Sequence, residues 1–150
     1  MSFQQKIGQG LVEGLPGDPA SSNPYSTIVR QVFGLCVPGR FLWLSANGKT
    51  ISSSGTGEPD AFCLRDQTQP TEQNSIPRGF PATGALNGDW YAVSKTTAAL
   101  KQKVFASNTD GSLSTGAAGA TIADHTETAF TVTKVAPPGT AGSAIVISKH

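Results

Sequence analysis

Acid–base chemistry has few candidate residues in this sequence. The side chains that titrate near neutral pH are two histidines, His125 and the terminal His150. A hydrolytic site needs a nucleophile, a base and a group that orients the base. The pattern "ADHTE" places Asp124 beside His125, but neighbouring residues of a strand point to opposite faces, so this carboxylate is poorly placed to orient the ring. We expect His125 to be a solvent-facing loop residue and the protein not to be an enzyme.

Metal and phosphate sites are weakly indicated as well. Two cysteines far apart in the chain and two histidines without a spacing motif do not make a zinc site. The carboxylates of Glu58, Asp60 and Asp110 stand in "GTGEPD" and "NTDGS", where turn formation accounts for them and the calcium-loop pattern is incomplete. The glycine-rich "GQGLVEGLPG" follows no strand and lacks the lysine and hydroxyl of a phosphate loop. No metal or other cofactor is expected.

The cysteines stand in the apolar stretches "GLCVPG" and "AFCLR", where a free thiol behaves as a small buried hydrophobe. A disulfide between Cys36 and Cys63 stays open as the alternative, and the reducing cytoplasm in which we expect the protein to be made and used argues against it. The N-terminus "MSFQQKIGQGLVEG" has no basic stretch followed by an apolar run, so no secretory signal is predicted. No stretch reaches the roughly 18 apolar residues of a membrane span.

Length and charge limit the domain count and the partners. The 150 residues suffice for one domain, and the formal net charge is +1 with acidic and basic residues interspersed. Because no block of like charge occurs, the sequence lacks the electrostatic pattern of a nucleic-acid-binding or anionic-membrane-binding protein. We expect neither a nucleic acid nor a membrane as a partner.

The elements predicted around these residues are strands. Seventeen glycines and ten prolines punctuate short apolar, β-branched and aromatic runs, which is typical of a turn-rich β protein. Such runs predict strands over 28–33, 40–45, 60–65, 89–94, 102–107, 128–135 and 143–149. Seven short strands favour an all-β fold, a single compact β-sandwich or β-barrel of jelly-roll-like type.

Other segments are assigned less directly. "NTDGS" and "LNGD" are predicted to be tight hairpin turns. The stretch 95–104 is expected to form a short turn leading into a strand rather than a full helix, and 115–123 fits either a loop or a flat strand. Aromatic side chains recur once or twice per strand and are expected to fill the core: Phe41, Trp43, Phe62, Phe80, Trp90, Tyr91, Phe105 and Phe130.

The stretch "VEGLPGDPASSNPYST" differs from everything that follows it. Pro16, Pro19 and Pro24 fix φ, remove backbone donors and bias the residues before them toward extended geometry. We therefore expect an extended N-terminal arm over 1–27 and a β domain over 28–150. Two interpretations of the arm are open: it lies across a neighbouring molecule, where its stiffness lowers the entropy lost on docking, or it covers a strand edge of its own domain.

Five segments carry a resemblance over nearly the whole chain: "VEGLPGDPASSNPYSTIV", "GRFLWLS", "RGFPATGALNGDWYAVS", "KQKVFASNTDGSL" and "GSAIVISK". They include a Gly-x-x-Gly-Asp-x-Ala-Ser-x-Asn-Pro pattern at 14–24, a Gly-Phe-Pro and then Gly-Asp-x-Tyr pattern at 79–91, and Lys-Val-Phe-Ala with Thr-Asp-Gly at 103–111. In this order the segments resemble the structural cement proteins of tailed bacteriophages, which are capsid decoration proteins. One departure is Lys101-Gln102, where a glycine is expected before "KVFA", so the shape of that turn is an open question.

The resemblance implies a function without an active site. It implies a small β domain that associates as a homo-dimer or homo-trimer, binds the major capsid protein on the outer surface of an HK97-fold head and holds adjacent capsomers together. The protein would be part of the virion and would assemble in the host cytoplasm. Many modest contacts, repeated around the shell, would together bind tightly.

The residues expected to contact the capsid or a neighbouring copy are in the arm and in the loop "IPRGFP". Tyr25 is the anchor in this interpretation because it is the large side chain of the arm, and its alternative role is to pack on its own domain. The loop offers an aromatic patch, and its alternative role is to close over the core. The full set is Pro16, Asp18, Pro19, Asn23, Pro24, Tyr25, Arg78 and Phe80.

Two other function classes remain as alternatives. A carbohydrate-binding or tail-associated β module would expose Trp43 and Trp90 as coplanar rings, whereas a cement protein would bury both. A hydrolase would need His125 within hydrogen-bonding reach of a serine or threonine and of a carboxylate.

Overall fold

The computed structural model describes residues 15–34, 36–65, 75–135, 142 and 144–150. Within these ranges all regular structure is β, so the prediction of an all-β protein is confirmed. The strands are β1 (Thr27–Val32), β2 (Phe41–Leu44), β3 (Thr50–Ser52), β4 (Ala61–Cys63), β5 (Pro81–Ala85), β6 (Gly88–Val93), β7 (Lys103–Ser107), β8 (Leu113–Gly116), β9 (His125–Val135) and β10 (Ala144–Lys149).

The first five strands form a closed barrel in the order β1-β3-β2-β4-β5. The pairing of β1 with β3 is parallel and the other pairings are antiparallel. Closure comes from the pairing of β1 with β5, which runs from Thr27 opposite Ala85 to Gln31 opposite Pro81. Because the barrel is closed, each of its strands has a partner on both sides.

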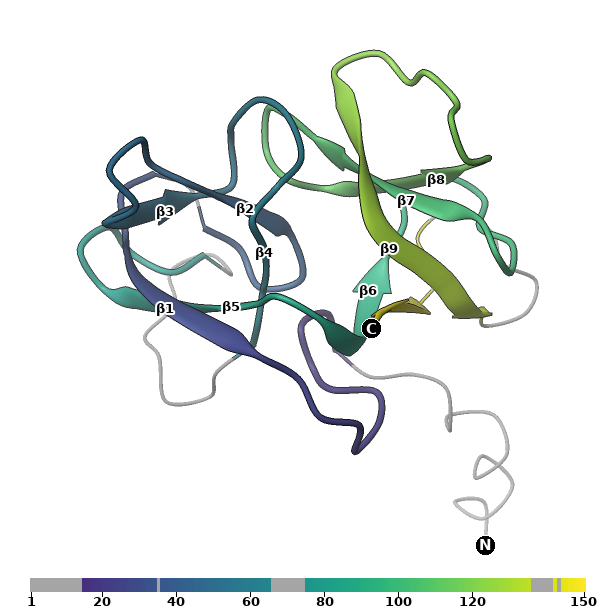
Figure 1. The fold of residues 1–150 in the computed structure, drawn as a ribbon, viewed down its shortest axis with the longest axis horizontal. Coiled ribbons are helices and arrows are strands. Elements are labelled where there is room, and N and C mark those ends of the chain that lie inside the picture. Colours follow the sequence, from purple (N-terminus) through teal and green to yellow (C-terminus); the bar gives the residue numbers. More distant parts are fainter. Residues whose placement is uncertain (1–14, 35, 66–74, 136–141, 143) are drawn as a thin grey trace, which may run out of the picture.

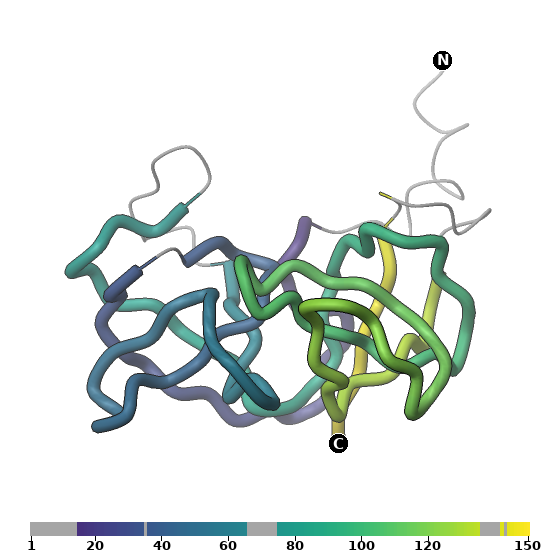
Figure 2. The backbone as a smooth tube through the Cα atoms, turned by 90° about the horizontal axis from the view of Figure 1, so that it is seen from above, coloured from purple at the N-terminus to yellow at the C-terminus, as the bar shows by residue number. Residues whose placement is uncertain are grey.

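The last five strands form an antiparallel sheet in the order β6-β10-β9-β7-β8. It curls so that its two edges meet at one end, where Ser94 bridges to Leu113. At the start of β6 the free edge is covered instead by the N-terminal segment, through a bridge between Pro19 and Trp90. Barrel and sheet lie side by side, as the ribbon and the view from above show (Figures 1 and 2).

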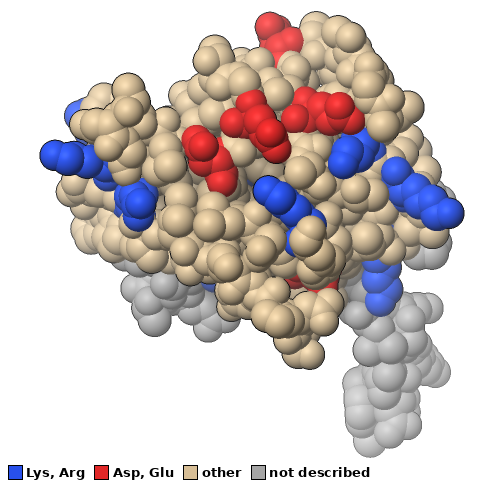
Figure 3. Space-filling view, viewed as in Figure 1, with Lys and Arg blue, Asp and Glu red and all other residues tan. Residues whose placement is uncertain are grey.

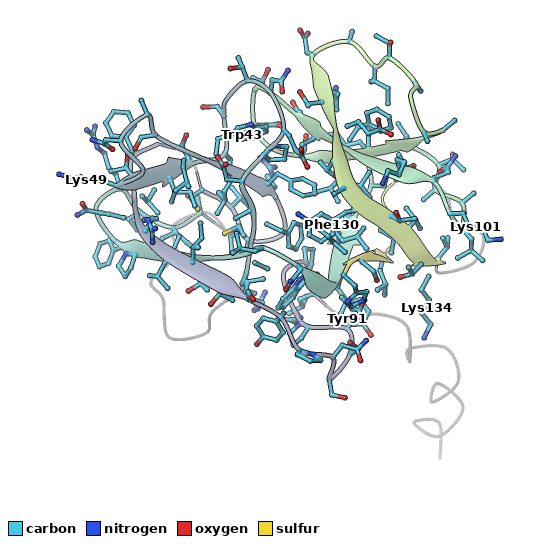
Figure 4. The ribbon with its side chains drawn as sticks, viewed as in Figure 1. Trp43, Lys49, Tyr91, Lys101, Phe130 and Lys134 are labelled. Atoms are coloured by element: carbon cyan, nitrogen blue, oxygen red, sulfur yellow. The ribbon has the colours of Figure 1, made fainter. Side chains whose placement is uncertain are left out.

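Strands β2 and β4 form a wall with a hydrophobic core on each side. Phe41 and Phe62 point into the larger core, which lies between barrel and sheet, whereas Leu42 and Cys63 point into the barrel interior. The alternation of side chains along a strand produces this division, and it explains why β4 is buried on both faces. Phe41, Phe62 and Phe130 pack as neighbouring rings in the larger core, and Trp43 of β2 and Phe130 of β9 lie between barrel and sheet in Figure 4.

The turn between β7 and β8 fastens the sheet to the barrel. The amide of Phe41 donates to the carbonyl of Gly111 at 2.9 Å, and the amide of Gly55 donates to the carbonyl of Asn108 at 3.0 Å. Gly111 has a φ of 72°, and a Cβ at this position would overlap the carbonyl oxygen of Phe41. Glycine is therefore required here by both backbone conformation and contact.

All seven predicted strands are present, and three further strands among the described residues were not predicted: β3, β5 and β8. The "NTDGS" hairpin prediction is confirmed, since it joins the paired strands β7 and β8. The "LNGD" prediction is wrong, because this turn joins β5 of the barrel to β6 of the sheet. Between β6 and β7 the structure has turns and no helix, and the stretch 115–123 begins as strand and continues as loop.

The aromatic core is also mostly as expected. Phe41, Trp43, Phe62, Trp90, Phe105 and Phe130 are buried and Tyr91 is half-buried. The expectation for Phe80 is wrong: this residue is 45% exposed and lies in the bend that precedes β5. In the described part of the chain, no helix is long and apolar enough to cross a membrane.

Candidate interaction surface

The described part of the N-terminal segment runs along the edge of β6. The amide of Gly17 donates to the carbonyl of Tyr91 at 2.9 Å, the amide of Tyr91 donates to the carbonyl of Asp18 at 3.0 Å, and the amide of Ala20 donates to the carbonyl of Asp89 at 2.9 Å. These bonds satisfy backbone groups of β6 that would otherwise face solvent at a strand edge. Residues 15–25 therefore contact their own domain, while residues 1–14 lie outside the described residues.

The carboxylate of Asp89 holds the same segment by its side chains. Its Oδ2 accepts hydrogen bonds from the hydroxyl of Ser21 at 2.5 Å and from the amide nitrogen of Asn23 at 2.7 Å. On the other side, Nε2 of His150 lies 2.9 Å from Oδ1. Partial burial raises the pKa of Asp89, but hydrogen bonds from Ser148, from the two arm residues and from His150 outweigh it and lower the pKa to about 2.

Apolar contacts complete the docking of the segment. The ring of Tyr25 meets the indole of Trp90 edge to face, with centroids 4.7 Å apart, and still leaves 49% of the residue exposed. Pro16 lies against Gly39, where a Cβ would overlap its side chain. Tyr25 thus packs on its own domain with one side and presents the other side to solvent.

The remaining predicted arm residues differ in exposure. Asp18 is half-buried, and its Oδ2 accepts from the amide of Leu15 at 3.3 Å. Pro19 and Pro24 are exposed. Asn23 is exposed too, although its side chain is engaged by Asp89.

Strand β1 presents a row of exposed side chains that continues from the arm. Residues 25–27 are all exposed, and from 27 to 33 exposed residues alternate with more buried ones, of which Ile28 and Val32 pack in the barrel core. At about 3.3 Å per residue this extended stretch is roughly 26 Å long. Three of these exposed residues, spaced four apart in the sequence, have large apolar side chains: Tyr25 at 49%, Val29 at 52% and Phe33 at 58% exposure.

The loop "IPRGFP" lies beside the far end of this row. The amide of Val32 donates to the carbonyl of Phe80, and the amide of Gly79 donates to the carbonyl of Val32, both at 2.9 Å. The guanidinium carbon of Arg78 lies 4.7 Å from the centre of the Phe33 ring, an arrangement that favours a cation–π interaction. We call Tyr25, Val29, Phe33, Arg78 and Phe80 the β1 surface.

Sequence reasoning named Tyr25, Arg78 and Phe80 as candidate contact residues but did not name Val29 and Phe33. These two lie in the predicted strand "IVRQVF", whose apolar residues suggest burial. The sequence does contain a signal for them. Val29 and Phe33 stand an even number of positions after Tyr25 and so point to the same face of the strand, whereas Ile28 and Val32 point to the other face. When apolar residues occupy both faces of a strand, either both faces are buried or one apolar face is exposed.

A groove borders the β1 surface. It has a volume of about 530 Å³, and its lining runs from Phe33 along β2 and β3 to the loop that holds Glu58 and Asp60. Asp60 is partly engaged, since its Oδ2 accepts from the amide of Leu44 at 2.8 Å. Acidic side chains gather over the middle of the face shown in Figure 3, with Lys and Arg to either side.

The two tryptophans that separate the function classes are buried. Trp43 is 5% exposed and donates from Nε1 to the carbonyl of Gly57 at 3.1 Å. Trp90 is 1% exposed and donates to the carbonyl of Asn87 at 2.9 Å. The predicted burial of both rings is confirmed, and the exposed coplanar pair expected of a carbohydrate-binding module is not formed.

His125 is not the solvent-facing loop residue that the sequence suggested. It is half-buried at the start of β9, with Nδ1 2.7 Å from the carbonyl of Ala123 and Nε2 3.3 Å from the hydroxyl of Ser114. A carbonyl only accepts, so Nδ1 donates this hydrogen bond. The group that orients the ring is thus a backbone carbonyl, where a hydrolytic triad has a carboxylate.

Asp110 has a structural role. Its Oδ1 accepts from the amide of Ser112 at 3.0 Å and from the hydroxyl at 2.6 Å, and its Oδ2 lies 3.5 Å from Nζ of Lys95 and 3.8 Å from Nη1 of Arg40. Burial raises the pKa of Asp110, and the Ser112 hydrogen bonds with the two positive charges outweigh it and lower the pKa to about 2. Among the described residues no group of three or more His, Cys, Asp or Glu side chains could hold a metal ion.

Comparisons with known proteins place this architecture among phage head proteins. The model of the XM1 gp53 minor capsid protein family matches residues 3–149. A chain in the solved capsid of Myoviridae phage XM1 shares the fold with a TM-score of 0.61 at 16% identity, over 99% of this chain and 97% of that chain. The N base of head fiber gp8.5 of bacteriophage phi29 has a TM-score of 0.53 at 10% identity, over 85% of this chain and 95% of that chain. No curated protein matches the sequence.

At such identities the two solved structures establish the fold, whereas the family model, which spans nearly the whole chain, establishes the relationship. The resemblance to phage capsid accessory proteins that was seen in the sequence is thereby confirmed. The chain belongs to the XM1 gp53 minor capsid protein family and has a structural role in a phage virion.

Proposed function

We propose that this protein is a capsid cement protein. It binds the major capsid protein on the outer surface of an HK97-fold head and bridges adjacent capsomers. The observation that carries the proposal is the β1 surface: three large apolar side chains in one exposed row, extended by Phe80 and Arg78. Aromatic residues and arginine are enriched at the centres of protein interfaces, whereas scattered single exposed hydrophobics carry no such meaning.

The closed barrel determines how this surface binds. β1 is paired with β5 from Thr27 to Gln31 and with β3 at Gln31 and Val32, so only the first part of its β3-side edge is left for a partner strand. Recognition occurs through side chains that insert into pockets of the partner, with Phe33 as the most exposed ring at 58%. The bordering groove widens the contact toward the loop of Glu58 and Asp60.

Bridging requires a second contact on a different part of the molecule. The N-terminal segment supplies it, since Leu15 is 51% exposed and Pro19 lies outward along the β6 edge of the sheet. One capsomer then contacts the barrel through the β1 surface and the next contacts the sheet side through the arm. Each contact can be modest, because attachment at one makes the other effectively intramolecular.

The docking of residues 15–25 supports a double role for the arm. Its backbone covers the edge of β6, as the interpretation of the arm as an edge cover requires, while Pro19, Pro24 and half of Tyr25 remain available to a neighbour. Neighbouring copies, as a dimer or trimer, would meet at symmetry positions of the shell. The protein acts in this way without enzymatic activity, which accords with a family of capsid proteins.

Co-sedimentation with undecorated, expanded phage heads tests the proposal. The variant Phe33→Ser/Phe80→Ser removes two exposed rings of the β1 surface, and Leu100→Ser, which changes a residue of 59% exposure in the loop before β7, is the matched control. We expect saturable binding of the wild type, at least tenfold weaker binding of the double variant, and unchanged binding of the control. If folded wild-type protein does not bind cognate heads, the proposal is overturned. If the double variant binds as tightly as the control, the β1 surface is not the surface that contacts the capsid.

Bridging is tested separately by the heat resistance of the heads. Decorated heads should release their DNA at a higher temperature than bare heads if copies hold capsomers together. A chain lacking residues 1–14 keeps every arm contact described above and so isolates the contribution of those residues. Removal of residues 1–27 would also uncover the edge of β6, and is unsuitable because aggregation would follow. Saturated heads that break at the temperature of bare heads would show decoration without bridging.

A further inference from the structure

The two cysteines meet inside the barrel. Their Sγ atoms are 3.6 Å apart, and both residues are fully buried. Cys63 ends β4, and Cys36 lies in the connection from β1 to β2. The two thiols therefore lie between this connection and β4 in the barrel core. Neither thiol touches the β1 surface or the arm in any contact described above.

The backbone fixes both positions. Cys63 is paired with the chain before β2: its amide donates to the carbonyl of Arg40 at 2.8 Å and its carbonyl accepts from Gly39 at 2.9 Å. The carbonyl of Cys36 accepts from the amide of Ile76 at 2.7 Å. A disulfide has a sulfur–sulfur distance of about 2.05 Å, so the side chains need to approach by roughly 1.5 Å for a bond to form. Rotation about the Cα–Cβ bonds moves the two sulfurs while the backbone hydrogen bonds stay in place.

We propose that Cys36 and Cys63 are an oxidation site, at which the two thiols become an intramolecular disulfide once the protein is in an oxidising medium. The proposal rests on the geometry of the pair and does not depend on the proposed cement function. A virion leaves the reducing cytoplasm, where cysteines stay as thiols, for surroundings in which disulfides persist. The bond would then close a loop that contains β2, β3 and β4, and so would restrict the unfolded barrel.

The reaction is thiol–disulfide exchange with a small disulfide such as oxidised glutathione. One cysteine thiolate attacks a glutathione sulfur, forms a mixed disulfide and releases one glutathione thiolate. The second cysteine thiolate attacks the protein sulfur of that mixed disulfide and releases the second glutathione. The two protons lost by the cysteines go to the two glutathione thiolates, and the two electrons reduce the oxidant.

Burial makes this reaction slow in the closed barrel. The hydrogen bond with Cys36, followed by burial and the adjacent sulfur, raises the pKa of the Cys63 thiol well above its ordinary value. The thiolate is the reactive form, so the reaction proceeds through brief openings and accelerates as pH rises. The cross-link is therefore made slowly and, once made, is protected from reductant by the same burial.

Exposure of the full-length protein to oxidised glutathione at pH 8, in urea below the unfolding midpoint, tests the proposal. We expect the mass to fall by the two hydrogens of the bond, a peptide joining residues 36 and 63 to appear, and the melting temperature to rise by roughly 10 °C. Dithiothreitol under the same conditions should reverse all three changes.

The single variants Cys36→Ala and Cys63→Ala separate the pair from general oxidation. Each should show one glutathione adduct and no rise in melting temperature. Three results would each overturn the proposal. The wild type could keep two free thiols after it has been held in urea, it could form disulfides only between chains, or its melting temperature could fall after oxidation. Mass spectrometry of alkylated protein from released particles supports it if the bond is present, and contradicts it if both thiols carry the alkyl group.

Discussion

The carboxylate of Asp89 lies 2.7 Å from the side-chain amide of Asn23, although 66 positions separate the two in the sequence. The same carboxylate accepts from Ser21 and faces His150, so one side chain connects the arm, the edge strand β6 and the C-terminus. Its hydrogen bonds are charge-assisted, which makes them about twice as strong as bonds between neutral groups. Asp89 is therefore the side chain that connects the arm to β6 and to His150 by hydrogen bonds.

Replacement of Asp89 by asparagine should loosen the arm. The amide keeps the shape but has no charge and one acceptor oxygen, so it cannot serve all the donors that the carboxylate serves. We expect a stability loss of about 1–3 kcal/mol and faster chymotrypsin cleavage after Tyr25, measured by urea unfolding and by mass spectrometry. Asp124→Asn, which changes an exposed carboxylate of the β8–β9 loop, is the control. An arm cleaved equally slowly in both variants would show that the backbone pairing holds it alone.

Acid should destabilise the protein through Asp89 and Asp110. Both have a pKa of about 2 in the folded state, below the roughly 3.9 of an unfolded aspartate. A depressed folded pKa contributes stability that is complete above the unfolded value and is lost as pH falls through the folded value. Urea midpoints should therefore be steady above about pH 5 and should decline between pH 4 and pH 2.

The double variant Asp89→Asn/Asp110→Asn distinguishes these two groups from the other carboxylates. It should be less stable than the wild type near neutral pH, and its midpoint should change less between pH 4 and pH 2. A decline as steep as that of the wild type would assign the acid sensitivity to other groups.

Replacement of Gly111 by alanine should damage the junction of barrel and sheet. The new Cβ would overlap the carbonyl oxygen of Phe41 and would stand on a backbone with a φ of 72°. Gly57 has a similar φ of 77° and open space around its Cβ position, so Gly57→Ala measures the backbone cost alone. We expect losses of about 1 kcal/mol at Gly57 and about 2–4 kcal/mol at Gly111 from urea unfolding. Equal losses would mean that the hairpin moves away from β2 at little cost.

The sequence predicted the parts of the fold that large side chains determine. Strands such as "RFLWLS" and "SAIVISK" have enough apolar residues to be recognised locally, whereas β3, β5 and β8 have small and polar residues, "TIS", "PATGA" and "LSTG". β3 and β5 exist because neighbouring strands pair with them on both sides, and β8 because it pairs with β7, and a local pattern does not encode such pairing. The misassigned "LNGD" turn has the same origin, since its composition does not tell which sheet the next strand joins.

The candidate interaction surface could also be predicted only in part. Tyr25, Arg78 and Phe80 were named as candidates because large side chains among prolines and glycines are conspicuous. Phe33 was missed because apolar residues of a strand are usually buried, and a closed barrel with one bare outer face is a tertiary feature. Asp89 could not be found, because an aspartate after glycine is an ordinary turn residue until folding brings Asn23 to it.

Replacement of Lys101 by glycine should stabilise the protein. Lys101 has a φ of 70°, so the turn before β7 keeps the left-handed backbone for which the family resemblance leads one to expect glycine. A left-handed residue other than glycine costs roughly 1–2 kcal/mol, and glycine loses about 0.5–1 kcal/mol more entropy on folding, so the net gain is about 0.5–1 kcal/mol. The amide of residue 101, which donates to the carbonyl of Val132 at 2.9 Å, is kept. Lys101→Ala removes the same exposed side chain without relieving the backbone, and should leave the urea midpoint nearly unchanged. If glycine lowers the midpoint, the lysine side chain stabilises this turn by more than its backbone strain costs.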